Sequence, residues 1–137
     1  MKYLIVVVGL PRSGKSTWSR NSGHPVVNKD AIRLALHGQR FYEPAETMVH
    51  ATSLLMADSL LRVHDTVIVD ECNVTAKRRS EWQKRFERPG ECEVNFHVIW
   101  TSPQECIRRA KGDEVLVPVI QRMAEEWDLQ KPPEWSL

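Results

Sequence analysis

The chain has 137 residues and a formal net charge of +1, and 42% of its residues are hydrophobic and 27% charged. This composition is typical of a soluble globular protein of one domain, residues 1–137. It excludes a membrane span, because no apolar run approaches the necessary length. The nearly neutral charge neither requires nor excludes a nucleic-acid partner.

Cysteine usage and the start of the chain bear on the cellular compartment. The three cysteines, Cys72, Cys92 and Cys106, are odd in number and form no CxxC pair. This is typical of reduced thiols and argues against structural zinc. The apolar run near the amino end follows a single lysine and lacks a small-residue cleavage site, so we expect no signal peptide. The sequence therefore predicts a cytoplasmic protein.

The amino-terminal segment carries the most specific pattern in the chain. A short apolar run, Tyr3 to Val8, is rich in β-branched residues and is typical of a buried strand in a parallel sheet. It leads into two glycines five residues apart, followed by Lys and Ser, at the start of an expected helix. This spacing matches the P-loop. The loop residues are Gly9, Leu10, Pro11, Arg12, Ser13, Gly14, Lys15, Ser16 and Thr17.

The residue types of this loop have a chemical explanation. Backbone N–H groups that converge on phosphates need backbone angles that a β-carbon hinders, and Gly9 and Gly14 relieve that hindrance. Lys15 can reach the β- and γ-phosphates. The Ser16 hydroxyl is placed to ligate Mg²⁺, with Thr17 as the alternative. The loop therefore predicts that the chain binds a nucleoside triphosphate such as ATP, together with Mg²⁺.

The remaining chain alternates between expected strands and helices. The helix 44–64 has apolar residues around most of its circumference and should be largely buried. The strand 93–100 alternates in polarity, which indicates an edge position or a less-covered face. Trp127 and Trp135 should anchor the tail 131–137 to the core. The expected strands are 3–8, 24–28, 66–69 and 93–100, and the expected helices are 15–21, 29–37, 44–64, 76–88, 103–110 and 117–127.

This alternation predicts a three-layer α/β domain with a four- or five-stranded parallel sheet. Ligands of such sheets bind beyond the carboxyl ends of the strands. Asp70 follows the third strand and is positioned to hold a Mg²⁺ shell beside the P-loop, with Glu71 as the alternative. Asp70 could instead be a helix-capping or turn residue.

Asp30 follows the second strand, and Arg33 lies three residues later on the same helical face. A carboxylate there could accept the proton of an attacking hydroxyl. The arginine would present a phosphate-binding cation beside it. The pattern is equally typical of an N-cap aspartate that forms a helical ion pair.

A short basic segment separates the last two expected helices. It contains Arg108, Arg109 and Lys111, with Gly112 just after, and suits a small lid that brings a guanidinium onto a transferring phosphoryl group. The alternative is a solvated helix end whose cations complement the dipole. The helix 76–88 is also basic, but its interleaved glutamates indicate a solvated face at least as strongly as a nucleic-acid contact.

At these residues the chain resembles the P-loop kinases, and most closely the 5′-kinase domain of phage-type polynucleotide kinases. The likeness spans nearly the whole chain. It is carried by residues 9–18, by 27–33 with Asp30 and Arg33, by Asp70-Glu71-Cys72-Asn73 with Arg78-Arg79, and by 117–123.

The resemblance implies a P-loop kinase fold with a small lid and an ATP- and Mg²⁺-dependent transfer of the γ-phosphate to a hydroxyl, most closely a polynucleotide 5′-hydroxyl. Asp30 would be the general base, Arg33 would bind the neighbouring phosphate, and Lys15 with a lid arginine would stabilise the phosphoryl group. The segment between the acidic residue and the Asn is longer than in the family, so Asp70 and Glu71 compete for one role. The lid is shortened, which leaves Arg108, Arg109 and Lys111 as rival candidates.

Two other functions fit the same residues. One is a small-molecule kinase for a nucleoside, sugar or antibiotic, because related enzymes use the same aspartate on such alcohols. The other is a module that binds ATP without transferring phosphate.

Overall fold

The computed structural model describes residues 1–136, so the last residue of the expected tail lies outside the described residues. Its centre is a parallel sheet with the strand order β2-β3-β1-β4. β1 pairs with β3 from Tyr3↔Thr66 and with β4 from Lys2↔Cys92. The strands are β1 (Lys2–Val8), β2 (Val26–Asn28), β3 (Thr66–Asp70) and β4 (Cys92–Val98).

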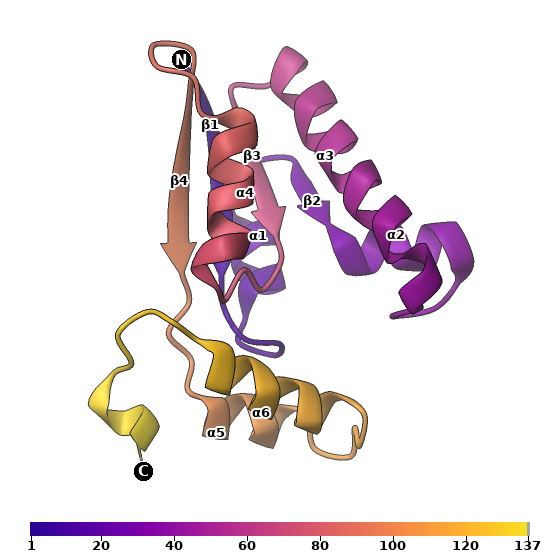
Figure 1. The fold of residues 1–137 in the computed structure, drawn as a ribbon, viewed down its shortest axis with the longest axis vertical. Coiled ribbons are helices and arrows are strands. Elements are labelled where there is room, and N and C mark those ends of the chain that lie inside the picture. Colours follow the sequence, from indigo (N-terminus) through magenta and orange to yellow (C-terminus); the bar gives the residue numbers. More distant parts are fainter. Residues whose placement is uncertain (137) are drawn as a thin grey trace.

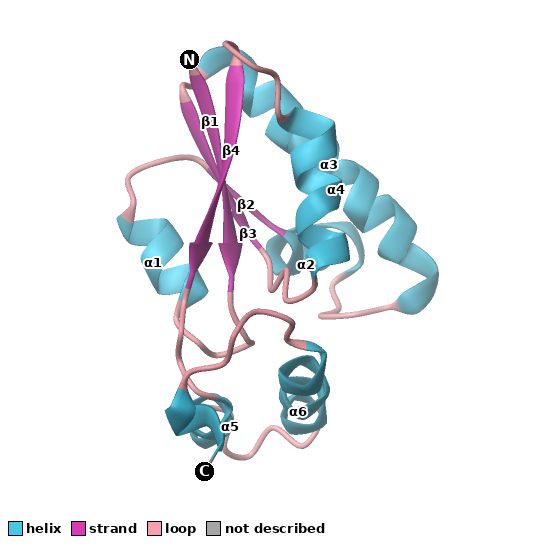
Figure 2. Ribbon diagram, turned by 60° about the vertical axis from the view of Figure 1, so that its left-hand side comes forward, coloured by secondary structure: helices cyan, strands magenta, loops and turns pink. Residues whose placement is uncertain are grey.

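Helices cover both faces of this sheet, which confirms the three-layer α/β prediction. α1 lies on one face, and α2, α3 and α4 lie on the other (Figures 1 and 2). α5 and α6 lie below the carboxyl ends of the strands. The helices are α1 (Lys15–Asn21), α2 (Lys29–His37), α3 (Glu46–Val63), α4 (Ala76–Phe86), α5 (Pro103–Arg109) and α6 (Leu116–Glu126), with 3₁₀ turns η1 (Glu43–Ala45) and η2 (Pro133–Ser136).

Side-chain caps explain why three of these helices begin where they do. The side chains of Asn28, Thr75 and Ser102 each accept a hydrogen bond from a backbone N–H in the first turn of α2, α4 and α5, respectively. Such caps satisfy donors that a helix start leaves free. The cap at Asn28 matters most for the site, because α2 follows β2 without any intervening loop.

The core lies between the sheet and the helices of its more heavily covered face. β1 and β3 contribute side chains from alternate positions, and α3 and α4 pack upon them. Trp82 and Phe86 of α4 are each 1% exposed, and their rings stack at 5.7 Å. This apolar cluster packs α3 and α4 against the sheet.

The prediction that 44–64 is largely buried is wrong. α3 buries a single stripe at four-residue spacing: Val49, Ser53, Ala57 and Leu61. Leu55 is 65% exposed and Val63 is 75% exposed. The physical reason is that an outer-layer helix has one face against the sheet, so residues on its far side meet solvent whatever their polarity.

β4 is an edge strand, as its alternating pattern predicted. Cys92 and Val94 are buried while Glu93 and Asn95 are exposed. The strand ends at Val98, two residues before the expected end.

A second apolar cluster joins the α5–α6 unit to the sheet. It contains Val8 and Leu10 at the end of β1, together with Cys106, Ile120 and Trp127. Trp127 and Trp135 contact each other edge to face at 4.8 Å and are 4% and 8% exposed. The expectation that they anchor the tail is therefore confirmed for the described residues.

We predict that Ile120→Ala lowers the free energy of unfolding by about 2–5 kcal/mol, because Ile120 is 0% exposed and its loss leaves a cavity beneath the sheet. Leu55→Ala, on the exposed side of α3, should change it by less than about 0.5 kcal/mol. Urea unfolding measures both values. Equal effects of the two changes would show that α6 does not belong to the cooperative core.

Candidate active site

The loop between β1 and α1 has the backbone of a phosphate cradle. A β-carbon on Gly9 would lie 2.7 Å from the Ser13 Oγ and 3.0 Å from the Lys15 side chain, so a larger residue would force these buried side chains to shift. Gly14 has a φ of 104° and precedes α1 directly. Arg12 also lies in the left-handed region, with a φ of 66°. Successive turns of this kind direct backbone N–H groups into a concavity that binds anions.

Two side chains in the loop fit a bound phosphate chain. The Ser13 Oγ is buried and has no hydrogen-bond partner among the described residues. Lys15 is 9% exposed, and its Nζ donates to the carbonyl oxygen of Leu10 at 2.9 Å. Unpaired buried polar groups are costly. A polyphosphate would provide acceptors for both groups.

Asp70 is the point at which the P-loop meets the end of the sheet. The Ser16 Oγ and the Asn28 Nδ2 both donate to its Oδ2, each at 2.8 Å. Within residues 1–136, no hydrogen bond reaches its Oδ1. Hydroxyl and carboxylate oxygens are the hard ligands that Mg²⁺ prefers, and Mg²⁺ sites commonly combine one or two carboxylates with substrate phosphates. The residues present therefore fit a Mg²⁺–nucleotide site.

Glu71 has different partners from Asp70. Its Oε1 lies 2.6 Å from the Nζ of Lys29, and both side chains are 11% exposed. The Nε1 of Trp82 donates to the other carboxylate oxygen at 3.1 Å. This position suits a structural ion pair, so the geometry favours Asp70 as the metal-site carboxylate.

His50 completes the polar contacts of Lys29. Its Nδ1 lies 3.0 Å from the Lys29 Nζ. Burial lowers the pKa of His50, and the charge of Lys29 lowers it further. A neutral imidazole ring can accept a hydrogen bond from the Lys29 ammonium group through Nδ1.

Asp30 and Arg33 lie together at the start of α2. Asp30 is exposed, and its Oδ1 accepts from Arg33 Nη1 at 2.8 Å. Glu46, the first residue of α3, accepts from the same guanidinium through Nε at 2.9 Å and Nη2 at 2.7 Å. Hydrogen bonding to Glu46 raises the pKa of Arg33, and the same contact lowers the pKa of Glu46. Arg33 therefore has three of its five N–H donors engaged by carboxylates.

The lid candidates differ in where they lie. Arg109 Nη1 donates to the carbonyl oxygen of Arg12 at 3.2 Å, so this guanidinium reaches the P-loop. Arg108 is 71% exposed and pairs with Glu105 on its own helix. Lys111 is exposed. The contact with the loop favours Arg109 as the lid cation.

The pKa values of two cysteines, Cys72 and Cys106, respond to the charges at this end of the sheet. Burial raises the pKa of Cys72, while the positive charge of Lys15 opposes the rise and the negative charges of Glu71 and Asp30 add to it. Burial raises the pKa of Cys106 to about 11, against the charges of Lys15 and Arg109. Both thiols remain protonated at neutral pH.

Asn28 links the two halves of the site. Its Nδ2 donates to Asp70, and its Oδ1 accepts from the backbone N–H of Ala31 at 2.8 Å. The P-loop half of the site (Ser16 and Asp70) is thus tied to the turn of helix that carries Asp30. No hydrogen bond or ion pair joins Asp30 to the P-loop in the part of the chain that the structure describes.

The sequence placed Asn28 at a strand end beside the ligand but did not reveal its role as a link, and it gave no role to Glu46. A signal existed for Asn28, because it ends a strand and precedes Lys29-Asp30, where a polar side chain must face the ligand edge of the sheet. No local signal existed for Glu46. It lies thirteen residues from Arg33, and only the folding of the α2–α3 connection brings the two together.

The loop after β3 fixes the end of β1. Asn73 Nδ2 donates to the carbonyl oxygen of Val7 at 2.9 Å. Arg79, from the basic helix α4, donates to the carbonyl oxygen of Asn73 and pairs with Asp128. At 12% side-chain exposure, Arg79 is structural rather than a surface cation.

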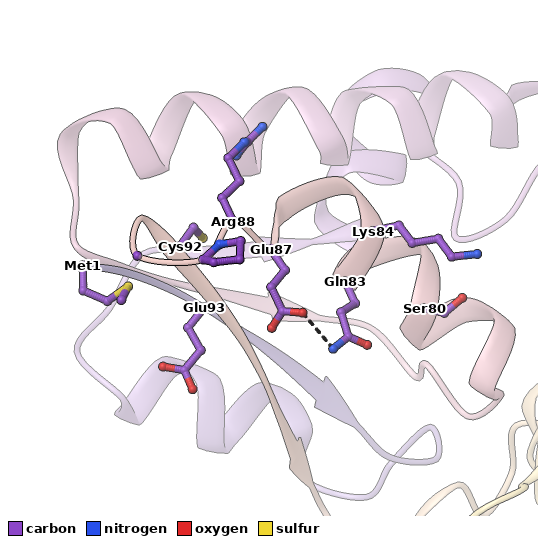
Figure 3. A pocket seen from close by; sticks show the side chains of 10 residues that line it. Met1, Ser80, Gln83, Lys84, Glu87, Arg88, Cys92 and Glu93 are labelled. Atoms are coloured by element: carbon purple, nitrogen blue, oxygen red, sulfur yellow. Dashed lines mark hydrogen bonds between the residues drawn. The ribbon is translucent and has the colours of Figure 1, made fainter.

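A separate hollow of about 550 Å³ lies at the opposite end of the sheet (Figure 3). The start of β4 and the end of α4 line it with both charge signs, including Lys84, Arg88, Glu87 and Glu93. Gln83 and Glu87 form a hydrogen bond to one another on its wall. None of the predicted site residues lines this hollow.

Comparison with known families decides the membership of the chain. The model of a family described as AAA domain (AAA_33) matches residues 4–114. The chain belongs to this family. The matched region includes the P-loop, Asp30, Arg33, Asp70 and Arg109.

Solved structures share the fold at low sequence identity. A chain of the Pnkp1/Rnl/Hen1 complex is 24% identical with a TM-score of 0.67, and the match covers 79% of this chain and 39% of that one. A chain of the Pnkp1/Rnl/Hen1 RNA repair complex is 21% identical with a TM-score of 0.69, and the match covers 94% of this chain and 47% of that one. A gluconokinase from Sinorhizobium meliloti 1021 is 20% identical with a TM-score of 0.53, and the match covers 91% of this chain and 74% of that one.

These likenesses show the three-layer α/β fold of the P-loop kinases. The chain spans less than half the length of the chains that it matches in the Pnkp1 complexes. No helix within residues 1–136 is both long and apolar enough to cross a membrane.

We predict that Lys29→Met lowers the free energy of unfolding by about 3–5 kcal/mol, because it leaves the buried Glu71 carboxylate without its cation. The double variant Lys29→Met/Glu71→Gln should recover most of this loss, because it removes the uncompensated charge. Urea unfolding of the four combinations measures the coupling. Additive effects of the two changes would contradict a direct ion pair.

Proposed function

We propose that this protein is an ATP-dependent kinase that transfers the γ-phosphate to an alcohol, and that this alcohol is the 5′-hydroxyl of a polynucleotide. The observation that carries the proposal is the link through Asn28 described above. It connects the P-loop hydroxyl and Asp70 with the helix start that presents Asp30 and Arg33. A donor-phosphate site and an acceptor site are thereby held on adjacent strands.

Each side chain has a role in this reaction. Asp30 accepts the proton of the attacking hydroxyl as its oxygen bonds to the γ-phosphorus. The bond from that phosphorus to the β–γ bridging oxygen breaks, and ADP leaves. Lys15 and Arg109 neutralise charge on the transferring group, and an arginine in this role contributes about 10³–10⁵-fold in rate.

Ser16 and Asp70 would hold the metal, and the backbone of residues 9–17 would hold the phosphates. When bound, Mg²⁺ would neutralise part of the negative charge on the β- and γ-phosphates. Arg33 has two N–H donors beyond those given to Asp30 and Glu46, and these would take the phosphate next to the acceptor hydroxyl.

Transfer of labelled phosphate from ATP to single-stranded 5′-hydroxyl oligonucleotides tests the acceptor. We expect a labelled 5′ end that requires Mg²⁺. A folded protein that labels neither DNA nor RNA ends would contradict this acceptor class.

A small alcohol is the second candidate acceptor. The acceptor side carries the carboxylates of Asp30, Glu43, Glu46 and Asp113 against two arginines, Arg33 and Arg40. This surface offers little excess positive charge to a long polyanion. Product with a small sugar or nucleoside, but none with oligonucleotides, would select this candidate.

We predict that Asp30→Asn lowers kcat by about 10²–10⁴-fold, because the amide cannot accept the proton. The affinity for ATP should not change, because Asp30 lies outside the P-loop. Steady-state kinetics and binding of a fluorescent ATP analogue measure the two quantities. Asp58→Asn, on α3, is the matched control and should leave both unchanged. Unchanged biological function of Asp30→Asn would instead indicate a module that binds ATP without catalysis.

We predict that Glu46→Gln raises KM for the acceptor and lowers kcat while KM for ATP stays the same, because the amide cannot bind Arg33 through two oxygens. Glu43→Gln is the matched control, since Glu43 is exposed and Glu46 is not. The lowered pKa of Glu46 means that its ion pair stabilises the fold above the ordinary glutamate pKa and that this contribution is lost on acidification. Glu46→Gln should therefore lose less stability than the wild type between neutral and acid pH. Equal changes in KM for both substrates would contradict a positioning role.

A further inference from the structure

The connection between α2 and η1 presents two neighbouring aromatic rings to solvent. Phe41 is 59% exposed and Tyr42 is 49% exposed. Single exposed aromatic residues are common on protein surfaces. Here two lie in succession beside the candidate acceptor site.

Three consecutive side chains of this connection are each tied to a different part of the protein. Arg40 pairs with Asp113, between α5 and α6, at 2.8 Å. Phe41 lies under the guanidinium of Arg33, 5.8 Å from its carbon to the ring centroid. The ring of Tyr42 meets that of His37 edge to face at 5.9 Å. The rings are thus held in place while keeping large exposed surfaces.

The cation above Phe41 is the one that holds the proposed general base. Arg33 donates to Asp30 at 2.8 Å and contacts Phe41 in the same structure. Arg33 therefore contacts both Asp30 and an exposed aromatic ring. An acceptor whose hydroxyl reaches Asp30 lies close to that ring.

The charges around the two rings indicate which part of an acceptor lies there. Arg33 pairs with Asp30 and Glu46, and Arg40 pairs with Asp113. Among the described residues of the connection 38–42, no other cation is present. The two free N–H donors of Arg33 serve the phosphate next to the acceptor hydroxyl, and the connection 38–42 offers no unpaired cation to a further phosphate, whereas a neutral aromatic group would stack on the rings. A nucleoside that ends in a 5′-hydroxyl is such a group, because its first phosphate lies on the 3′ side.

We propose that Phe41, supported by Tyr42, forms a stacking platform for the terminal nucleobase of the acceptor. This inference rests on the proposed kinase function and narrows its substrate class to 5′-hydroxyl nucleoside ends, as opposed to sugars without a base. Stacking on an aromatic side chain tolerates any of the bases, so the platform selects nucleosides without reading sequence.

The test compares two acceptors: a single-stranded ten-nucleotide thymidylate with a 5′-hydroxyl, and the same strand with an abasic first nucleotide. Phe41→Ala should raise KM for the first strand by about 5- to 100-fold, the loss expected for one stacked base. It should leave KM for ATP unchanged, and it should not raise KM for the abasic strand above the wild-type value. Phe41→Trp should retain the wild-type KM, and Tyr42→Ala should show a smaller increase.

Leu55→Ala is the control, because Leu55 is exposed on α3 and should affect neither strand. Fluorescence anisotropy of the two strands, labelled at the 3′ end, gives affinities independent of turnover. Equal losses on both strands, or none on either, overturn the platform but leave the kinase proposal standing. A wild type that neither binds nor phosphorylates the strands, yet phosphorylates a small sugar, overturns the platform and the polynucleotide acceptor together.

Discussion

The site depends on one carboxylate oxygen, the Oδ2 of Asp70, which accepts from Ser16 and Asn28 at the same distance. Ser16 belongs to the phosphate loop, and Asn28 begins the helix with Asp30. Because Asp70 is 4% exposed, water competes little for these bonds. A single buried acceptor therefore sets the spacing between the P-loop and the helix start that carries Asp30.

The Lys29–Glu71 pair repeats this connection one residue further along each strand end. Lys29 precedes Asp30 and Glu71 follows Asp70, so the ion pair joins the same two backbone segments at a second point. Two contacts between the same backbone segments restrict their relative rotation more than a single contact would. The pair is buried, with His50 and Trp82 in contact with it, and such a contact would help to hold the groups of the proposed reaction in position.

The sequence was sufficient for most of the fold because each element has local signals. The apolar strands, the caps at Thr75 and Ser102, and the P-loop spacing all lie within a few residues of the elements that they define. The burial of α3 could not be predicted, since solvent exposure depends on how many layers surround a helix and not on its own composition. The partners of Asp70, Arg33 and Arg109 also required the fold, because they join residues 13 to 97 positions apart. The roles of the site residues stay predictions.

The contact between Arg40 and Asp113 has a consequence for the environment in which the protein works. It joins the α2–α3 connection to the α5–α6 unit, and Asp113 also accepts from the backbone N–H of Leu116 at the start of α6. Arg40 is 63% exposed, so dissolved ions screen this attraction. This contact between the two flanks of the site is therefore weaker in concentrated salt than in dilute buffer.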